Sequence, residues 1–162
     1  MGDLRIKDLV VEYASGQESV RPINGLNLDV SAGSLAILLG PRGCGKTTLL
    51  SCLGGVLRPS AGRIEFGDID ITKLDASALS DYRRNTVGIV FQAFNLVPSL
   101  TAIENVMVPM RAARIGRHEA RERAAELLTR VGLSNRMTHR PGDLSGGQQQ
   151  RVAGARAIAL DP

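Results

Sequence analysis

Apolar and polar residues alternate along the first thirty positions, in two stretches with a polar segment between them. The first stretch lies within residues 4–11 and the second within residues 20–30, with Ala14-Ser15-Gly16-Gln17 separating them. A period of two is typical of strands that bury one face. The pattern therefore predicts an antiparallel hairpin with a polar turn.

Two later runs are continuously apolar, which is the pattern of strands buried on both faces in a parallel sheet. One is 34–39, between Gly33 and Gly40, and the other is 87–91, which ends at Gln92. Neither run approaches the roughly 18 residues needed to cross a bilayer. We expect the first run to be a central strand of the fold.

Helical spacing of apolar residues appears in four segments. These are 49–57, 76–84, 101–110 and 117–131, and two further short strands are expected at 63–66 and 69–71. Residues 93–143 then read as an all-helical insert on an α/β base. The predicted fold class is α/β.

Composition narrows the possible functions. The 162 residues are 43% hydrophobic and 22% charged, which suits one globular domain and excludes a disordered chain. The net charge of +4 raises the question of nucleic acid, but the basic residues are scattered, and three Phe, two Tyr and no Trp give no stacking platform. Two cysteines without metal-ligand spacing are expected to be reduced thiols. We predict no nucleic-acid partner.

The glycines are more informative, because several of them build a recognisable loop. The segment Gly40-Pro41-Arg42-Gly43-Cys44-Gly45-Lys46-Thr47-Thr48 matches G-x-x-x-x-G-K-[ST] and stands between a predicted strand and a predicted helix. Backbone N–H groups in such a loop hold phosphates, and the helix start adds the positive end of its dipole. Lys46 would reach the β- and γ-phosphates, Thr47 would hold Mg²⁺, and Thr48 would contact an α-phosphate oxygen. The alternative interpretation is a simple glycine-rich turn.

A second glycine-containing segment opens the last predicted helix. Leu144-Ser145-Gly146-Gly147-Gln148 precedes a run that continues to Leu160. Ser145 alone is an ordinary N-cap residue, whereas the free N–H groups of a helix start can also bind an anion.

Together, the phosphate loop and the downstream LSGGQ resemble the ATP-binding cassette (ABC) transporter ATPases. The resemblance implies a P-loop NTPase with a RecA-like parallel sheet core, an N-terminal antiparallel β part and a helical subdomain. On that pattern, the β part and P-loop core occupy 1–92, the helical subdomain 93–143 and the signature helix 144–162 of a single nucleotide-binding domain whose core is incomplete at the C-terminus.

The resemblance also assigns roles to individual residues. Tyr13 takes the place of the adenine-stacking aromatic, and Gln92 that of the glutamine that contacts Mg²⁺ and water and senses the transmembrane partner. In a head-to-tail homodimer or pseudo-homodimer, the signature of one subunit touches ATP held by the other. The resemblance implies Lys46 and Gln92 as catalytic residues, and Thr47 and Gln92 as ligands of Mg²⁺. The residues that it implies as contacts to ATP in the same subunit are Tyr13, Gly40, Pro41, Arg42, Gly43, Cys44, Gly45, Lys46, Thr47 and Thr48. The contacts that it implies to ATP of the other subunit, in trans, are Ser145, Gly146, Gly147 and Gln148.

The family's activity is ATP hydrolysis that drives a membrane permease. Residues 91–106 are similar to the subgroup that serves lipoprotein release, macrolide export and the cell-division permease. This likeness implies export or extraction from a membrane, and a cytoplasmic subunit held on the inner face of the membrane by its permease. It names neither the transported substrate nor the permease.

The sequence departs from the family pattern after the signature helix. The family continues with an apolar strand that lies beside the strand preceding the phosphate loop and ends in Asp-Glu, then a D-loop and a switch histidine, none of which follows Leu160-Asp161-Pro162. The general base is therefore absent from these residues, and Arg42 stands where the family usually has Ser. The alternative hypothesis is a nucleotide-binding, dimerising fragment without its own hydrolysis.

Overall fold

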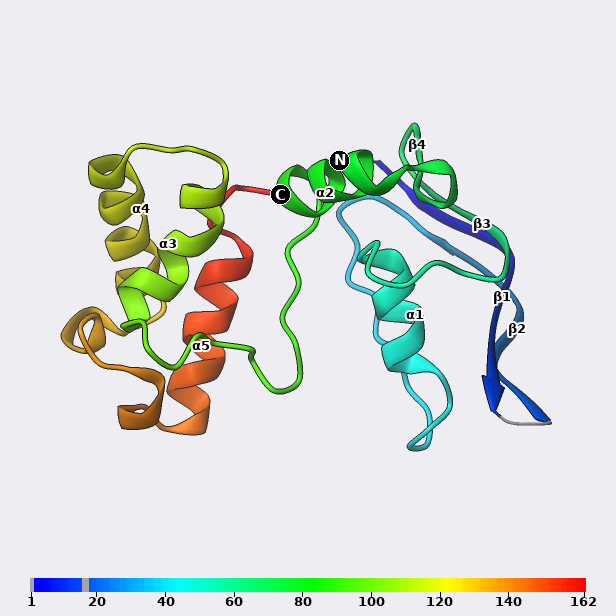
Figure 1. Cartoon of the computed structure of the whole chain (residues 1–162), viewed down its shortest axis with the longest axis horizontal. Coiled ribbons are helices and arrows are strands. Elements are labelled where there is room, and N and C mark those ends of the chain that lie inside the picture. Colours follow the sequence, from blue (N-terminus) through cyan, green and yellow to red (C-terminus); the bar gives the residue numbers. More distant parts are fainter. Residues whose placement is uncertain (1, 16–17) are drawn as a thin grey trace. The chain divides into compact units, whose positions relative to one another are not determined.

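The N-terminal hairpin forms as predicted. The computed structural model describes residues 2–15 and 18–162, and pairs β1 (Leu4–Ser15) with β2 (Glu18–Val30) in antiparallel register, with Leu4 opposite Val30. The predicted turn residues Gly16 and Gln17 lie outside the described residues. Two further antiparallel strands, β3 (Ala61–Phe66) and β4 (Ile69–Asp70), complete a sheet in the order β2-β1-β3-β4, drawn in Figure 1.

The chain divides into two compact units, Met1–Ser80 and Asp81–Pro162. In the first unit, α1 (Lys46–Leu53) contacts β2, and a short 3-10 helix (Ile71–Lys73) follows β4. Apolar side chains of the sheet and of α1 form the interior of this unit, because alternate strand positions face the same side. Its buried hydrophobic residues are Ile6, Leu9, Val11, Ile23, Leu49, Cys52, Ile64 and Ile71.

The second unit is helical. Helix α2 (Ala76–Asn85) begins before the division between the units, and α3 (Ala102–Ala112), α4 (Arg117–Arg130) and α5 (Gly146–Ala157) pack against one another. Two single-turn 3-10 helices, Ser134–Arg136 and Pro141–Asp143, connect α4 to α5. The core of this unit combines the apolar faces of its helices with the loops between them: Ala102, Ile103, Val106, Met107, Met110, Ala120, Ala124, Leu127, Leu128, Leu133, Leu144, Val152, Ala155 and Ala159.

The two predicted buried strands are absent, and this corrects the expectation of a parallel sheet core within these residues. Segments 34–39 and 87–91 carry no strand, and the side chains of Leu35 and Leu39 are 89% and 88% exposed. A β-strand needs a neighbouring strand to satisfy its backbone N–H and C=O groups. The part of the chain that the structure describes supplies no such neighbour to either segment, so their apolar side chains meet solvent.

The first helix is also shorter than predicted. The apolar spacing suggested a helix through residue 57, but α1 ends at Leu53, with Gly54 as its C-cap. Gly55 then adopts a left-handed conformation, with φ of 62°. Two consecutive glycines end the helix because neither favours helical backbone, and this outweighs the spacing of the apolar residues beyond them.

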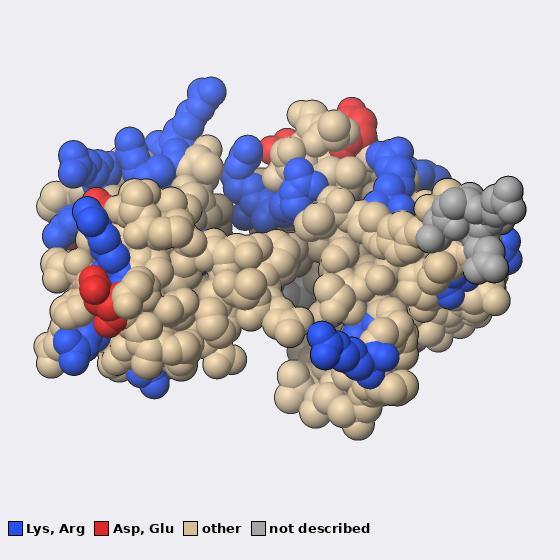
Figure 2. All heavy atoms as spheres, turned by 60° about the horizontal axis from the view of Figure 1, so that its bottom comes forward, with Lys and Arg blue, Asp and Glu red and all other residues tan. Residues whose placement is uncertain are grey.

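The surface is mixed in charge. On the face drawn in Figure 2, Lys and Arg side chains stand in several separate groups with uncharged surface between them. No helix among the described residues is long and apolar enough to span a membrane.

Candidate nucleotide-binding site

The glycine-rich loop enters α1 through a left-handed residue. Gly45 is the N-cap of α1, with φ of 91°, and a Cβ placed there would lie 2.4 Å from the carbonyl oxygen of Pro22. A side chain at this position would therefore suffer both backbone strain and a collision with β2. Glycine is required here by the way the loop passes over the sheet.

The start of α1 presents N–H groups that the helix does not use. The first intrahelical bond runs from the Leu49 N–H to the Gly45 carbonyl, at 2.8 Å. The amides of Lys46, Thr47 and Thr48 precede that bond, and no side chain caps the helix. The first turn also contains no acidic residue. Unused N–H donors and the positive end of the helix dipole together favour an anion.

The Lys46 ammonium folds back over the loop. Its Nζ donates to the carbonyl oxygens of Gly40 and Pro41, at 2.8 and 2.7 Å, and lies 3.3 Å from the Cys44 Sγ. The structure thus brings Lys46 together with the residues that the sequence pattern grouped with it. The positive charge is therefore held against the backbone of the loop itself.

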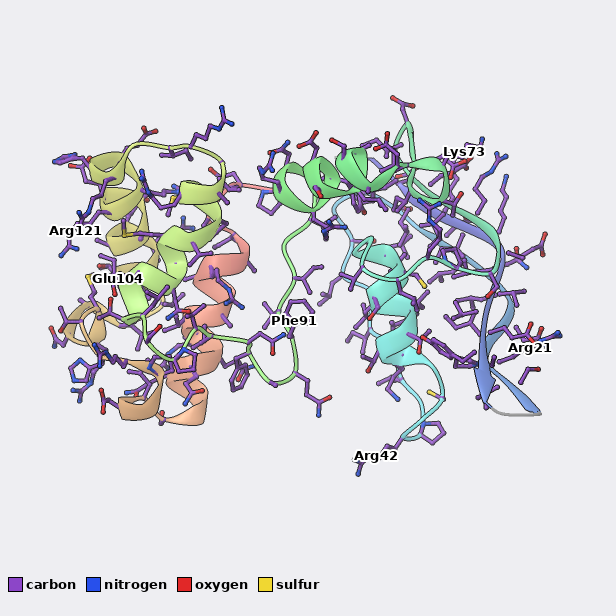
Figure 3. All side chains as sticks on the ribbon, in the orientation of Figure 1. Arg21, Arg42, Lys73, Phe91, Glu104 and Arg121 are labelled. Atoms are coloured by element: carbon purple, nitrogen blue, oxygen red, sulfur yellow. The ribbon has the colours of Figure 1, made fainter. Side chains whose placement is uncertain are left out.

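The remaining loop residues are open to solvent. Arg42 lies at the outer end of the loop (Figure 3), and the Thr47 side chain is exposed while Thr48 is partly buried. An open pocket of about 690 Å³ lies beside the loop in the first unit. Its lining comes from β2, the segment before the loop and the start of α1: Pro22, Ile23, Asn24, Gly25, Leu26, Asn27, Ile37, Leu38, Leu39, Cys44, Gly45, Lys46 and Leu49.

Of the predicted site residues, Cys44, Gly45 and Lys46 line this pocket, and Tyr13 and Gln92 are among those that do not. Tyr13 pairs with Val20 across the hairpin, next to a register shift after Val11, and is 43% exposed. Gln92 belongs to the second unit, where it is exposed in a turn directly after Phe91. Phe91 itself is labelled in Figure 3. Each side chain is accessible to a ligand.

The signature segment forms a capping box. Ser145 Oγ accepts from the Gln148 N–H at 3.3 Å, and Gln148 Oε1 accepts from the Ser145 N–H at 2.8 Å. Gln149 adds bonds from its Nε2 to the carbonyl oxygens of Pro141 and Leu144. The expected N-cap is confirmed, and the loop before α5 is held in place from within the helix.

No contact or backbone conformation within the described residues requires glycine at Gly146 or Gly147. A Cβ at either position would have no heavy atom within 4 Å, and neither residue has positive φ. Glycine at the start of a helix lowers its stability relative to alanine. Bare backbone at this point suits the close approach of another molecule.

Sequence reasoning missed Asn105, a fully buried amide in α3. Its side chain accepts from the Val97 N–H and donates to the carbonyl oxygens of Val97, Leu100 and Thr101, so it shapes the loop that follows Gln92. A signal existed, because Asn105 is the polar member of an otherwise apolar helix face. Sequence reasoning also missed Arg156 in α5, for which no such signal exists, because an arginine is common in an amphipathic helix.

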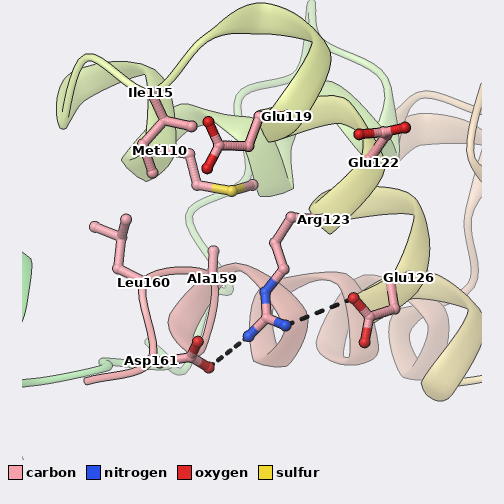
Figure 4. Close-up of a pocket in the computed structure, with 9 residues that line it drawn as sticks. All are labelled: Met110, Ile115, Glu119, Glu122, Arg123, Glu126, Ala159, Leu160 and Asp161. Carbon is pink, nitrogen blue, oxygen red and sulfur yellow. Dashed lines mark hydrogen bonds and ion pairs between the residues drawn. The ribbon is translucent and has the colours of Figure 1, made fainter.

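A second pocket, of about 480 Å³, lies within the helical unit (Figure 4). Met110, Ala159 and Leu160 provide apolar surface, and the Arg123 guanidinium is paired with Glu126 and Asp161. The cation is thus already neutralised by two carboxylates. This pocket contains none of the predicted nucleotide contacts.

The comparisons with known proteins agree with this geometry. Residues 23–162 match the family model described as "ABC transporter". An uncharacterized ABC transporter ATP-binding protein of Mycobacterium tuberculosis is 72% identical over all 162 residues, which are 49% of that protein. The lipoprotein-releasing system ATP-binding protein LolD of Geobacter metallireducens is 46% identical over 159 residues, covering 98% of this chain and 71% of the relative.

Solved structures show the same fold. The ATP-binding cassette MJ0796, in a dimeric post-hydrolysis state with ADP and phosphate bound, superposes with a TM-score of 0.93 at 38% identity, over 98% of this chain and 70% of that one. The present chain spans about half the length of the mycobacterial relative. The phosphate loop, the signature helix and the match over residues 23–162 show that the chain belongs to the ABC transporter family of ATP-binding proteins.

Proposed function

We propose that this chain is the ATP-binding part of an ABC transporter ATPase, in which residues 40–48 hold the phosphates of ATP. One observation carries the proposal: at the start of α1, unused backbone N–H groups and the Lys46 ammonium converge on the same loop. Phosphate is the ligand for which such a loop is built. Tyr13 would stack on the adenine.

The residues present also suit Mg²⁺ that arrives with the nucleotide. The Thr47 hydroxyl is exposed in the first turn of α1, where a hard cation bound to phosphate oxygens takes oxygen ligands. Gln92 offers a second oxygen from an exposed turn. Bound Mg²⁺ would neutralise phosphate charge, while Lys46 and the loop amides orient the nucleotide.

In this proposal the signature segment contacts the nucleotide that a second subunit holds. Ser145, Gly146, Gly147 and Gln148 leave bare backbone and a capped helix start open to solvent. The solved relative MJ0796 is dimeric with ADP and phosphate bound, which supports a nucleotide-dependent dimer. By analogy with the LolD relative, the whole protein would act on a membrane permease, in export or lipoprotein extraction, from the cytoplasmic face.

Thermal unfolding with and without MgATP tests the proposal, with Lys46→Ala as the paired variant. At 100 times its Kd, a ligand stabilises the folded state by about 2.7 kcal/mol, which raises the Tm by several degrees in a domain of this size. We expect that shift in the wild-type chain and its loss in Lys46→Ala. An equal shift in both proteins would contradict the proposed phosphate site.

Hydrolysis is assigned to the whole protein. No apolar strand ending in Asp-Glu, the family's position for the general base, occurs after the signature helix in these 162 residues. We therefore expect steady-state ATPase activity near background, which Lys46→Ala barely changes. Robust turnover that depends on Lys46 would show that another group supplies the base.

A further inference from the structure

Arg156, in the last turn of α5, binds the turn that follows Gln92. Its Nη1 donates to the carbonyl oxygen of Asn95 at 2.7 Å and its Nη2 to that of Phe94 at 2.6 Å. The side chain is partly buried, and this burial lowers its pKa, but an arginine keeps its charge in proteins. Bonds from a charged donor are shorter and stronger than those between neutral groups.

The turn that Arg156 binds has an unusual backbone. Phe94 and Asn95 both adopt left-handed conformations, with φ of 59° and 46°. Asparagine tolerates this region, whereas an aromatic residue such as Phe94 rarely adopts it, so the strain lies mainly at Phe94. The turn's own bonds, from Phe94 N–H to Phe91 O and from Asn95 N–H to Ala93 O, span only two or three residues. External donors such as the Arg156 guanidinium therefore help to keep it in this shape.

The segment before Gln92 meets the same end of α5. A Cβ added to Gly88 would lie 2.4 Å from the carbonyl oxygen of Ala157, so the two backbones are in close contact. Gln92 thus stands between two attachments to the last turn of α5, at Gly88 and at 94–95. At about 1.5 Å per residue, the 12 residues of α5 connect these attachments to Ser145 as one stiff rod.

We propose that Arg156 is a positioning residue that ties the turn carrying Gln92 to the signature helix, so that Gln92 and Ser145–Gln148 move as one element. The inference rests on the proposed function, in which both groups contact nucleotide. A displacement of the signature by a second subunit's ATP would then be transmitted along α5 to Gln92.

Amide hydrogen exchange tests the tie itself, without nucleotide. Arg156→Met keeps the apolar stem and removes the donors. The Phe94 and Asn95 amides should exchange about tenfold faster in this variant, with Arg156→Lys intermediate because an ammonium lacks the planar fork. The Val97 amide, which donates to Asn105 instead, is the internal control and should not change. Unchanged exchange at Phe94 and Asn95, or an equal increase at Val97 that indicates general loosening, would overturn the proposal.

A second measurement separates this inference from the proposed function. Arg156→Met should retain the Lys46-dependent thermal shift with MgATP, because the phosphate loop lies in the other unit, but should raise the MgATP concentration needed for self-association. Arg151→Met, an exposed arginine on the same helix, is the matched control. In a double-mutant cycle with Gln92→Ala, the effects on that concentration should be non-additive, and additive effects would overturn the coupling.

The outcomes of the two proposals remain distinguishable. A wild-type chain with no MgATP shift counts against the proposed phosphate site, while the exchange rates at Phe94 and Asn95 still decide the role of Arg156. A normal shift together with unchanged exchange overturns the inference and leaves the proposed function standing.

Discussion

Asn105 and Val97 bind each other twice. Asn105 Oδ1 accepts from the Val97 N–H at 2.8 Å, and its Nδ2 donates to the Val97 carbonyl at 3.2 Å. Further bonds to Leu100 and Thr101 occupy the same fully buried amide. One side chain therefore supplies the loop that leads into α3 with hydrogen bonds that its backbone groups would otherwise make in a helix or a sheet.

Replacing Asn105 with alanine should be strongly destabilising. The variant leaves a cavity and several backbone groups without partners, so we expect a loss of about 2–4 kcal/mol in the free energy of unfolding. Urea denaturation measures it. Asn135→Ala, at an exposed position in the 3-10 helix Ser134–Arg136, is the control and should change the free energy by less than about 0.5 kcal/mol. Equal effects of the two variants would contradict the assigned role.

Acid should remove a small stabilisation at the start of α3. Glu104 accepts from the Thr101 N–H and hydroxyl, and chiefly the backbone bond holds the pKa of this carboxyl below its ordinary value of 4.5. A lowered pKa in the folded state stabilises above the ordinary pKa, and the stabilisation is lost as pH falls through the folded-state value.

Glu104→Gln should therefore lower the Tm at pH 7, and the difference from wild type should shrink as pH falls below about 4.5. Melting curves at pH 7 to 3 measure it, with Asp68→Asn, in the exposed turn between β3 and β4, as control. The effect is small because Glu104 is exposed. A difference that grows with acidity would show that the sign is wrong.

The two thiols should react at very different rates. Cys44 is exposed in the phosphate loop, whereas Cys52 is buried, and burial raises the pKa of its thiol to about 11. Only the thiolate reacts with a maleimide, so at pH 8 we expect modification of Cys44 first and of Cys52 slower by orders of magnitude. Intact-mass time courses measure both rates.

MgATP should slow the modification of Cys44, because the thiol lies 3.3 Å from Lys46 Nζ within the proposed phosphate site. Cys44→Ser should leave only the slow reaction. Rates for Cys44 that do not depend on nucleotide would argue that the loop does not hold phosphate.

The exposed run before the phosphate loop should contribute little to stability. Leu35 and Leu39 are 89% and 88% exposed, so Leu35→Ser combined with Leu39→Ser should change the free energy of unfolding by less than about 1 kcal/mol, two surface changes of about 0.5 each. The double variant should also aggregate less, because exposed apolar side chains promote association. Leu9→Ala, at a fully buried site in β1, should instead cost about 2–5 kcal/mol.

Elements that depend on nearby residues were predictable. The hairpin follows from alternation within 4–11 and 20–30, and α5 from a serine N-cap with glutamine three positions later. The prediction of strands at the apolar runs 34–39 and 87–91 was wrong, because a strand forms only when a neighbouring strand pairs with it. Whether such a neighbour is present depends on the whole fold and not on the run itself. The link from Arg156 to Phe94 joins positions far apart in sequence, and no local pattern announces it.

The register of β1 has a consequence for folding during synthesis. Leu4 lies opposite Val30 on one side and Phe66 on the other, so one edge of β1 finds its partner much sooner than the other. At roughly 5–20 residues per second, ribosomal synthesis delays β3 behind β2 by seconds, whereas a hairpin closes in microseconds. The β1–β2 hairpin is then a nascent-chain intermediate with one unpaired edge, which finds its partner only when β3 has been made.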